Sequence, residues 1–277
     1  MGKMIIASPR YSDAGVITTS SEDSLLPVVN LLKIQPTEVW ESDTLTSVTI
    51  DIDLNVKRTV NLIAFLFHNL RQTGTIKITA ADTQGGLATP PDDTGNLAAW
   101  AQDAPSTSTW HDTNDDADRW AFTRNHFIHY LSTPFARRWF RLSFTDAGNP
   151  DGVFRGGRLI LDNAWLPSIK FSLLNYVNVG RSIKRRTSGG AVVTTPKPTA
   201  PKITATIQSS DNEELWANFD ELQKLQKDSA DILVIGDRET GPFRHKTIVY
   251  GHMILGQPQS FPNWERFEQK MIVEGMI

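Results

Sequence analysis

Two groups of side chains have the chemistry and spacing to hold a metal ion, and the first is a pair of histidines. His126 and His129 stand three residues apart, a spacing that brings two imidazoles to one face of a helix. Their neighbours Phe127, Ile128 and Tyr130 are typical of an aromatic strand, on which positions three apart face opposite sides. We therefore expect a strand here, with a histidine metal site as the alternative.

The second group lies between Asp112 and Asp118, where Asp and Asn recur at alternate positions as at the start of a calcium-binding loop. Such a loop also requires glycine at its sixth position and an acidic residue at its twelfth. The sequence has Ala117 and Thr123 there. We expect a solvated acidic loop, with a looser calcium site as the alternative.

Motifs for enzymatic chemistry are missing from the sequence. There is no cysteine, which excludes a thiolate metal site and a cysteine nucleophile. The Gly-x-Ser-x-Gly elbow, the phosphate-binding loop and the dinucleotide fingerprint are also absent. We predict a protein that is not an enzyme and has no cofactor. A β-rich hydrolase stays an alternative, because catalytic carboxylates can come from distant positions.

Basic residues gather in the segment 178–202, which contains no acidic residue. It includes Arg181, Lys184, Arg185 and Arg186, a Gly-Gly pair and three prolines. Strand-like sequence on both sides favours an extended hairpin over an interdomain linker. The four residues are possible assembly contacts through salt bridges between subunits. Phosphate binding is disfavoured because no aromatic residues are interleaved and the net charge is -3, so no specific nucleic-acid binding is expected.

Eight tryptophans make a carbohydrate-binding surface worth testing. The segment from Gly85 to Asp118 is long, which is typical of an interaction loop, with a short helix over 95–102 as one option. Trp100, Trp110 and Trp120 lie in or just after this segment and are possible glycan contacts. Most tryptophans are nevertheless expected to be core or interface anchors.

Composition is that of a globular chain, with 39% apolar and 21% charged residues among 277. No window approaches the roughly 18 apolar residues of a membrane span. The apolar stretch at the N-terminus is too short for a signal peptide. We expect a protein made in the cytoplasm, without a membrane partner, that reaches the outside only as part of a particle.

Strand patterns dominate the first part of the chain. Alternation of apolar and polar residues predicts strands at Val48–Leu54 and Thr75–Ala80, and a continuous apolar run predicts one buried on both faces at Thr59–Phe67. Arg138–Phe144 and Arg158–Leu161 follow, separated by turn-forming residues. Short strands separated by such turns favour a sandwich or jelly roll.

The remainder combines strands with one helix, predicted over residues 211–227 from its capping residues and the spacing of Leu215, Phe219 and Leu222. Strands are expected at Phe171–Val179, Ile203–Ile207, Ile232–Ile235, His245–Leu255 and Phe267–Val273. The predicted fold class is mainly β. Residues 1–168 form a jelly-roll β-sandwich, and residues 169–277 form an α+β sandwich with one flanking helix.

Several stretches resemble discoidin-like (galactose-binding-like) jelly rolls of phage minor tail proteins. They are Leu26-Pro27, Asn30-Leu31-Leu32, Gln35 to Trp40, Ile50 to Leu54, Asn61 to Ala64 and His68-Asn69-Leu70, with Arg137 to Leu142, Asp146 to Asp151 and Gly157-Arg158-Leu159 near the end. The part from about residue 170 is similar to the sandwich-plus-helix unit of phage tail-tube and distal tail proteins. The order of the two domains is the reverse of the best-known distal tail proteins.

This resemblance implies a structural protein of the virion, in the tail tip or baseplate of a bacteriophage. It implies a ring, commonly a hexamer, that joins the tail tube to the hub or receptor-binding apparatus. The implied partners are further copies of the chain, the tail tube protein, the tape-measure protein and the tail hub protein. The alternative function is a glycan-binding module that recognises polysaccharide of the host surface.

Overall fold

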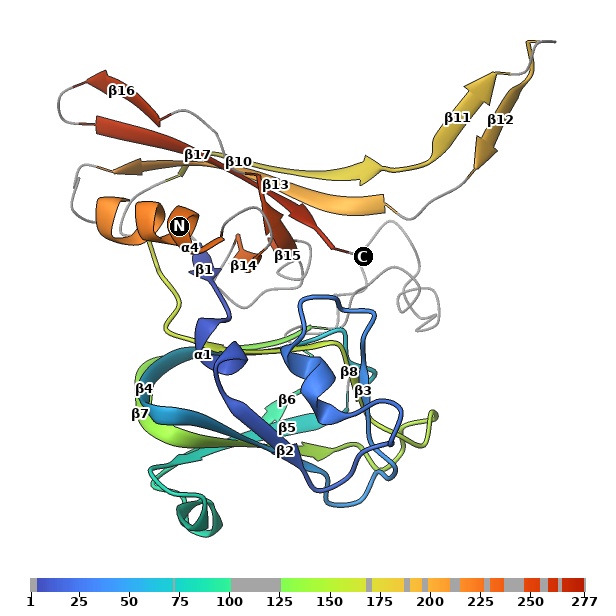
Figure 1. Cartoon of the computed structure of the whole chain (residues 1–277), viewed down its shortest axis with the longest axis vertical. Helices are drawn as coiled ribbons and strands as arrows, with labels where there is room; N and C mark the ends of the chain where they lie inside the picture. The colour runs from blue at the N-terminus through green and yellow to red at the C-terminus, as the bar shows by residue number, and fades with distance from the viewer. Residues whose placement is uncertain are drawn as a thin grey trace. The chain divides into compact units, whose positions relative to one another are not determined.

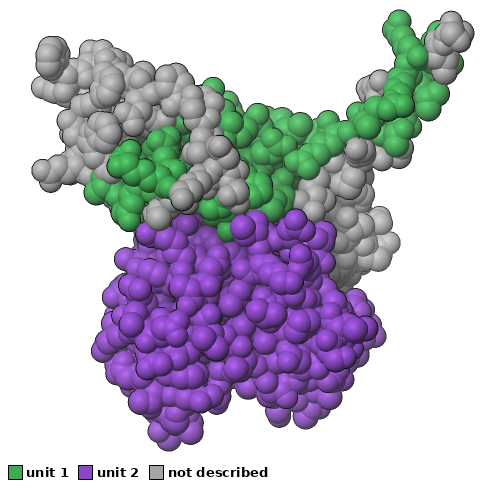
Figure 2. All heavy atoms as spheres, viewed as in Figure 1, with its two compact units in different colours: residues 1–6, 165–237, 247–277 green, residues 7–164, 238–246 purple. Residues whose placement is uncertain are grey.

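A computed structural model shows a mainly-β protein, which confirms the predicted fold class (Figure 1). It describes residues 4–71, 73–100, 126–167, 171–186, 190–195, 199–209, 215–226, 230–236, 247–254, 259–263 and 266–276. The chain forms two compact units (Figure 2). Unit 2 contains residues 7–164 and 238–246, and unit 1 contains residues 1–6, 165–237 and 247–277.

Unit 2 is a jelly-roll β-sandwich whose two layers share their longest strands. The strands are β2 (Val16–Thr19), β4 (Thr49–Leu66), β5 (Thr75–Ala81), β6 (Asp92–Ala98), β7 (His126–Thr145) and β9 (Arg158–Asp162). The first half of β4 and the last half of β7 lie in the layer β2-β4-β7-β5-β6. The second half of β4 pairs with β9 and with the beginning of β7.

The bend between these layers occurs where β4 loses its regular pairing. The register of β4 with β7 shifts between Asp53 and Arg58, and Asn55 has a φ of 63°. Residues 55–59 are exposed, whereas both flanking stretches are buried. The strands predicted separately at Val48–Leu54 and Thr59–Phe67 are therefore one continuous, bent strand. Their patterns differ because the first half buries Asp51 and Asp53, each paired with an arginine, between its apolar residues, whereas the second half is mostly apolar on both faces.

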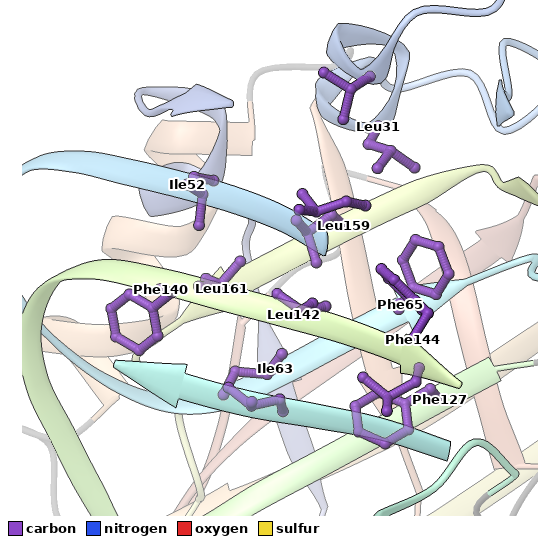
Figure 3. Packing of buried hydrophobic residues seen from close by; sticks show 14 of the residues in the cluster. Leu31, Ile52, Ile63, Phe65, Phe127, Phe140, Leu142, Phe144, Leu159 and Leu161 are labelled. Carbon is purple, nitrogen blue, oxygen red and sulfur yellow. The ribbon is translucent and has the colours of Figure 1, made fainter. Parts of the chain in front are cut away.

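The core of unit 2 fills the space between the layers (Figure 3). Alternate residues of the first layer point inward, among them Ile52, Phe140 and Leu142. Ile63 and Leu159 meet them from the second layer. Such alternation is what a strand with one covered face requires. Shorter elements surround the sandwich: α1 (Arg10–Asp13), η1 (Val28–Leu32), β3 (Trp40–Glu41), η2 (Gly85–Ala88) and β8 (Arg155–Gly156).

The option of a short helix over residues 95–102 is wrong for residues 95–100, the part of this range that the structure describes. Strand β6 covers this region up to Ala98 and pairs with β5. Thr94 bridges the two strands, because Ile78 N donates to Thr94 Oγ1 at 3.1 Å and that hydroxyl donates to Ile78 O at 3.2 Å. Gly95 has a φ of 67°, at a break in the register that short-range sequence patterns do not reveal.

Unit 1 is built on a seven-stranded sheet with the order β1-β14-β15-β17-β13-β10, and β16 pairs with β17. Its strands are β1 (Ile5–Ala7), β10 (Phe171–Gly180), β13 (Thr199–Ser209), β14 (Asp231–Ile235), β15 (Ile248–Met253), β16 (Gln259–Asn263) and β17 (Arg266–Gly275). One helical segment, η3 (Leu215–Asp220) continuing as α4 (Glu221–Gln226), buries Phe219 and Leu222 in the core of the sheet. The helix predicted over 211–227 is confirmed within the described residues. None of the described helices combines the length and apolarity that crossing a bilayer requires.

The two units differ from the predicted domains 1–168 and 169–277 at the N-terminus and at the boundary between the domains. The chain leaves unit 2 after Ala164, and the N-terminal strand β1 belongs to the sheet of unit 1, where it lies beside β14. Backbone hydrogen bonds between Ile6 and Trp165, at 3.0 and 2.8 Å, tie the two chain segments together. A strand that pairs with residues more than 200 positions away carries no local signal of its partner.

Candidate assembly surface

Unit 1 has a long β-hairpin, the end of which contributes no described residue to the core of the unit. Strands β10 and β13 pair in the sheet, and the chain between them continues as the two-stranded ribbon β11 (Ile183–Arg186) and β12 (Val192–Thr195). We call this ribbon the hairpin arm; Figure 1 shows it projecting beyond the end of the sheet of unit 1. The arm confirms the hairpin predicted for this segment.

Apolar side chains of the arm are exposed on both of its faces. Val192 is 55% exposed and Val193 is 54% exposed, and adjacent residues of a strand face opposite sides. Ile183 is exposed as well and lies on the same face as Val193. A two-stranded ribbon without a covering layer is marginally stable in water. The arm therefore has the composition of a surface that a partner covers.

The basic residues predicted as assembly contacts lie on or beside the arm. Arg185 pairs across the ribbon with Val193, and Arg186 with Val192, so each face carries one arginine next to one valine. Both arginines are exposed. Lys184 belongs to β11, and its side chain lies outside what the structure describes. Arg181 differs from them, because its Nη2 donates to Glu274 Oε1 within unit 1 at 2.7 Å.

An acidic and apolar loop stands out on the surface of unit 2. Leu25 is 85% exposed at the centre of this loop, and Val29 is half exposed. Glu22 and Asp23 shape it, since Val28 N donates to Glu22 Oε2 and Leu25 N to Asp23 Oδ1, both at 2.7 Å. We call residues 22–29 the Leu25 loop. Nothing in its sequence marked it as a surface in advance.

The tryptophans predicted as glycan contacts can be placed only in part. The ring of Trp100 packs against the core of unit 2, and its Nε1 donates to Leu70 O at 2.7 Å. These contacts give Trp100 a structural role. Trp110 and Trp120 lie outside the described residues, as does the acidic segment from Asp112 to Asp118.

His126 and His129 both lie on strand β7, as the aromatic pattern around them predicts. His126 is buried; its Nδ1 accepts a long hydrogen bond from Phe67 N at 3.4 Å, and its ring meets the Phe67 ring edge-on. His129 stacks beside Phe127. Within the part of the chain that the structure describes, no three metal-binding side chains come together.

An aromatic and ionic patch on the outer face of the first layer escaped the sequence analysis. Arg138 binds both oxygens of Asp53, at 2.6 and 2.7 Å, and Arg141 binds Asp51 in the same way. The hydrogen bonds from Arg138 hold the pKa of Asp53 below its usual value. Trp139 lies half-buried beside these pairs, with the Arg138 guanidinium over its ring. Because each aspartate lies 85 or 90 positions from its arginine, only the pairing of β4 with β7 brings them together.

A buried carboxylate lies where the chain leaves unit 2. Asp162 Oδ2 accepts a hydrogen bond from Ser8 N at 2.9 Å. Burial raises the pKa of Asp162 to about 6, against smaller lowering effects of the Ser8 amide and of Arg10. Beside it, Asn61 holds the backbone of Ala164 through both its amide groups, at 2.7 and 3.1 Å. The arrangement secures the backbone at the unit boundary.

Asp162→Asn is expected to stabilise unit 2 above pH 6. Between about pH 4 and 6 the folded protein keeps a proton that the unfolded chain releases, so the charged carboxylate lowers stability as pH rises through that window. Asparagine still accepts from Ser8 N but carries no charge. We expect a gain on the order of 2 kcal/mol at pH 7 and little change at pH 4, measured by urea unfolding. Asp43→Asn, an exposed site of the same unit, is the control; an equal gain there would contradict the effect of burial.

Comparisons with known proteins give a likeness in fold but no family. No protein-family model matches the chain, and no curated protein matches it. Among solved structures, similar ones include a CBM32 module, CpGH89CBM32-6, from Clostridium perfringens (10% identity, 56% of this chain, 98% of that chain, TM-score 0.37). The family 32 module of NanJ from the same organism, in complex with galactose, is 14% identical and covers 57% of this chain and 98% of its own, with a TM-score of 0.37. Chitosan-binding module 1 of a Paenibacillus chitosanase/glucanase is 14% identical and covers 55% of this chain and 96% of its own, with a TM-score of 0.36.

Proposed function

We propose that this protein is a structural subunit that assembles with copies of itself. The hairpin arm is the observation that carries the proposal. It exposes Ile183, Val192 and Val193, and its residues add nothing to the core of unit 1. Exposed apolar surface on an unsupported ribbon is a liability in a monomer, because it invites association. A subunit that buries this surface in an assembly removes the liability.

The assembly that fits this subunit is a ring in the tail tip of a bacteriophage, joining the tail tube to the hub. The sequence resemblance to minor and distal tail proteins supports this placement. The two-unit organisation agrees with it, since a jelly-roll unit and a unit with a helix-covered sheet are both present. The tail tube, tape-measure and hub proteins are the heterologous partners to test.

Loss of assembly on changing the arm is the test. The wild type is expected to form a ring by light scattering after gel filtration and by electron microscopy. Val192→Ser with Val193→Ser should shift the chain to a monomer without unfolding it, because both side chains are exposed. Val56→Ser, at a 49% exposed position on β4, is the matched control and should leave the ring intact. A wild type that is monomeric at all concentrations would refute the proposal.

The outer-face patch favours a second candidate function, the binding of polysaccharide. The face of the Trp139 ring away from the Arg138 guanidinium is the one on which the apolar side of a sugar ring would stack, and Arg138 and Arg141 offer hydrogen-bonding groups around it. Galactose and chitosan, the ligands named for the similar modules, are the first sugars to test. Binding that disappears in Trp139→Ala but persists in Trp100→Phe would support this candidate. Unchanged binding in Trp139→Ala would exclude the patch as its site.

A further inference from the structure

Charge is distributed unevenly between two segments that each expose large apolar side chains. The chain has 28 basic and 31 acidic residues. Six of the basic and none of the acidic residues lie in the segment 181–202, which contains the hairpin arm. The Leu25 loop, residues 22–29, has two acidic residues, Glu22 and Asp23, and no basic ones. Opposite charges thus surround the exposed apolar groups of two different units.

The two surfaces also match in layout. On one face of the arm, Ile183 and Val193 stand beside Arg185. On the loop, the exposed Leu25 and half-exposed Val29 follow Glu22 and Asp23, whose carboxylates accept hydrogen bonds from the loop amides of Val28 and Leu25. Each surface is an apolar centre with charge at its border. This is the usual arrangement of a protein interface, in which apolar contact gives affinity and complementary charge selects the partner.

We propose that the hairpin arm of one copy binds the Leu25 loop of the next copy, through the face that carries Ile183, Arg185 and Val193. The inference rests on the proposed self-assembly and names its contact. The contact joins two different surfaces, so each copy offers one arm and one loop. Such head-to-tail contacts generate a closed ring when the rotation between copies closes. A phosphate polymer as the partner of the arm is disfavoured, because it would leave the exposed isoleucine and valines uncovered.

Engineered cysteines test this contact directly, because the natural chain contains none. Leu25→Cys and Val193→Cys are made in separate chains, and the two proteins are mixed under oxidising conditions. A disulfide-linked dimer containing one chain of each kind is the expected product. Leu25→Cys mixed with Val192→Cys is the matched control, because Val192 lies on the opposite face of the same ribbon. A chain carrying both Leu25→Cys and Val193→Cys should give a ladder of linked oligomers that ends at the ring size.

Charge reversal provides a second measurement that does not depend on disulfide geometry. Arg185→Glu is expected to raise the concentration needed for assembly by about 10-fold, and Arg186→Glu, on the other face, by much less. Suppose that the protein assembles, but Leu25→Cys and Val193→Cys do not link and Arg185→Glu has no effect. That result would overturn this contact and leave the proposed self-assembly standing. A wild type without any oligomer would overturn both.

Discussion

Replacing Gly251 by alanine is expected to destabilise unit 1 strongly. A Cβ atom on Gly251 would lie 1.9 Å from the backbone oxygen of Glu274 and 2.7 Å from Gly275 Cα. These are backbone atoms of the neighbouring strand β17, so no side-chain rotation can relieve the overlap. Strands β15 and β17 would have to separate at the centre of the seven-stranded sheet. We expect a loss of at least about 3 kcal/mol, measured as the free energy of unfolding in urea.

Gly180→Ala is the matched control for Gly251→Ala. Gly180 ends strand β10 of the same sheet, and a Cβ atom there would meet no atom within 4 Å. Its effect should stay within about 0.5 kcal/mol, as is usual for exposed positions without special contacts. If both alanine variants unfold at the same urea concentration as the wild type, then β15 and β17 do not approach as closely as described. Hydrogen exchange of the β15 and β17 amides would locate the damage independently.

The strands that sequence patterns predicted well are those whose burial follows a simple period. Thr75–Ala80 alternates because one face lies on the core, and strand β5 covers almost the same residues, Thr75–Ala81. The run Ile232–Ile235 is apolar throughout because strand β14 is buried on both faces. The arm was predictable for a different reason. Strand-like stretches lie on both sides of a segment rich in glycine and proline, which is the pattern expected of a hairpin.

The features that escaped prediction depend on partners far away in the sequence. Strand β1 is only three residues long, and it is a strand because β14 lies beside it. The outer-face patch needs Asp53 of β4 and Arg138 of β7, which are 85 positions apart. The Leu25 loop was missed because exposure cannot be inferred from an apolar residue alone. For Trp100 the sequence left open whether the ring is exposed, and only the fold places it against the core.

Acid stability of unit 2 is expected to depend on one buried histidine. His68 follows strand β4 and stacks on Phe65 with ring centroids 5.9 Å apart. Neither of its ring nitrogens makes a hydrogen bond of ordinary geometry. Burial lowers the pKa of His68 to about 3, against a smaller raising effect of the Ala99 backbone. The ring is therefore held neutral in the folded protein at pH values where it is charged in the unfolded chain.

His68→Phe is expected to stabilise unit 2, most of all in acid. In the wild type the unfolded chain takes up a proton below pH 6.5, and the folded protein does so only near pH 3, so stability is lost as pH falls through that window. Phenylalanine removes this loss and can keep the stack on Phe65. The gain should be about 3 kcal/mol near pH 4, measured by urea unfolding at several pH values. His129→Phe, at a half-buried position, is the control and should give much less.

His68 and Asp162 act in opposite directions between pH 4 and 6. As pH falls through that window, His68 costs stability because the unfolded chain gains its proton, whereas Asp162 restores stability because its folded carboxyl takes up a proton first. The free energy of unfolding of the wild type should therefore change little between pH 4 and 6, because the two larger changes from His68 and Asp162 oppose each other. Asp162→Asn should expose the loss on acidification, and His68→Phe should expose a gain. Parallel profiles for the two variants would mean that neither group titrates as its burial requires.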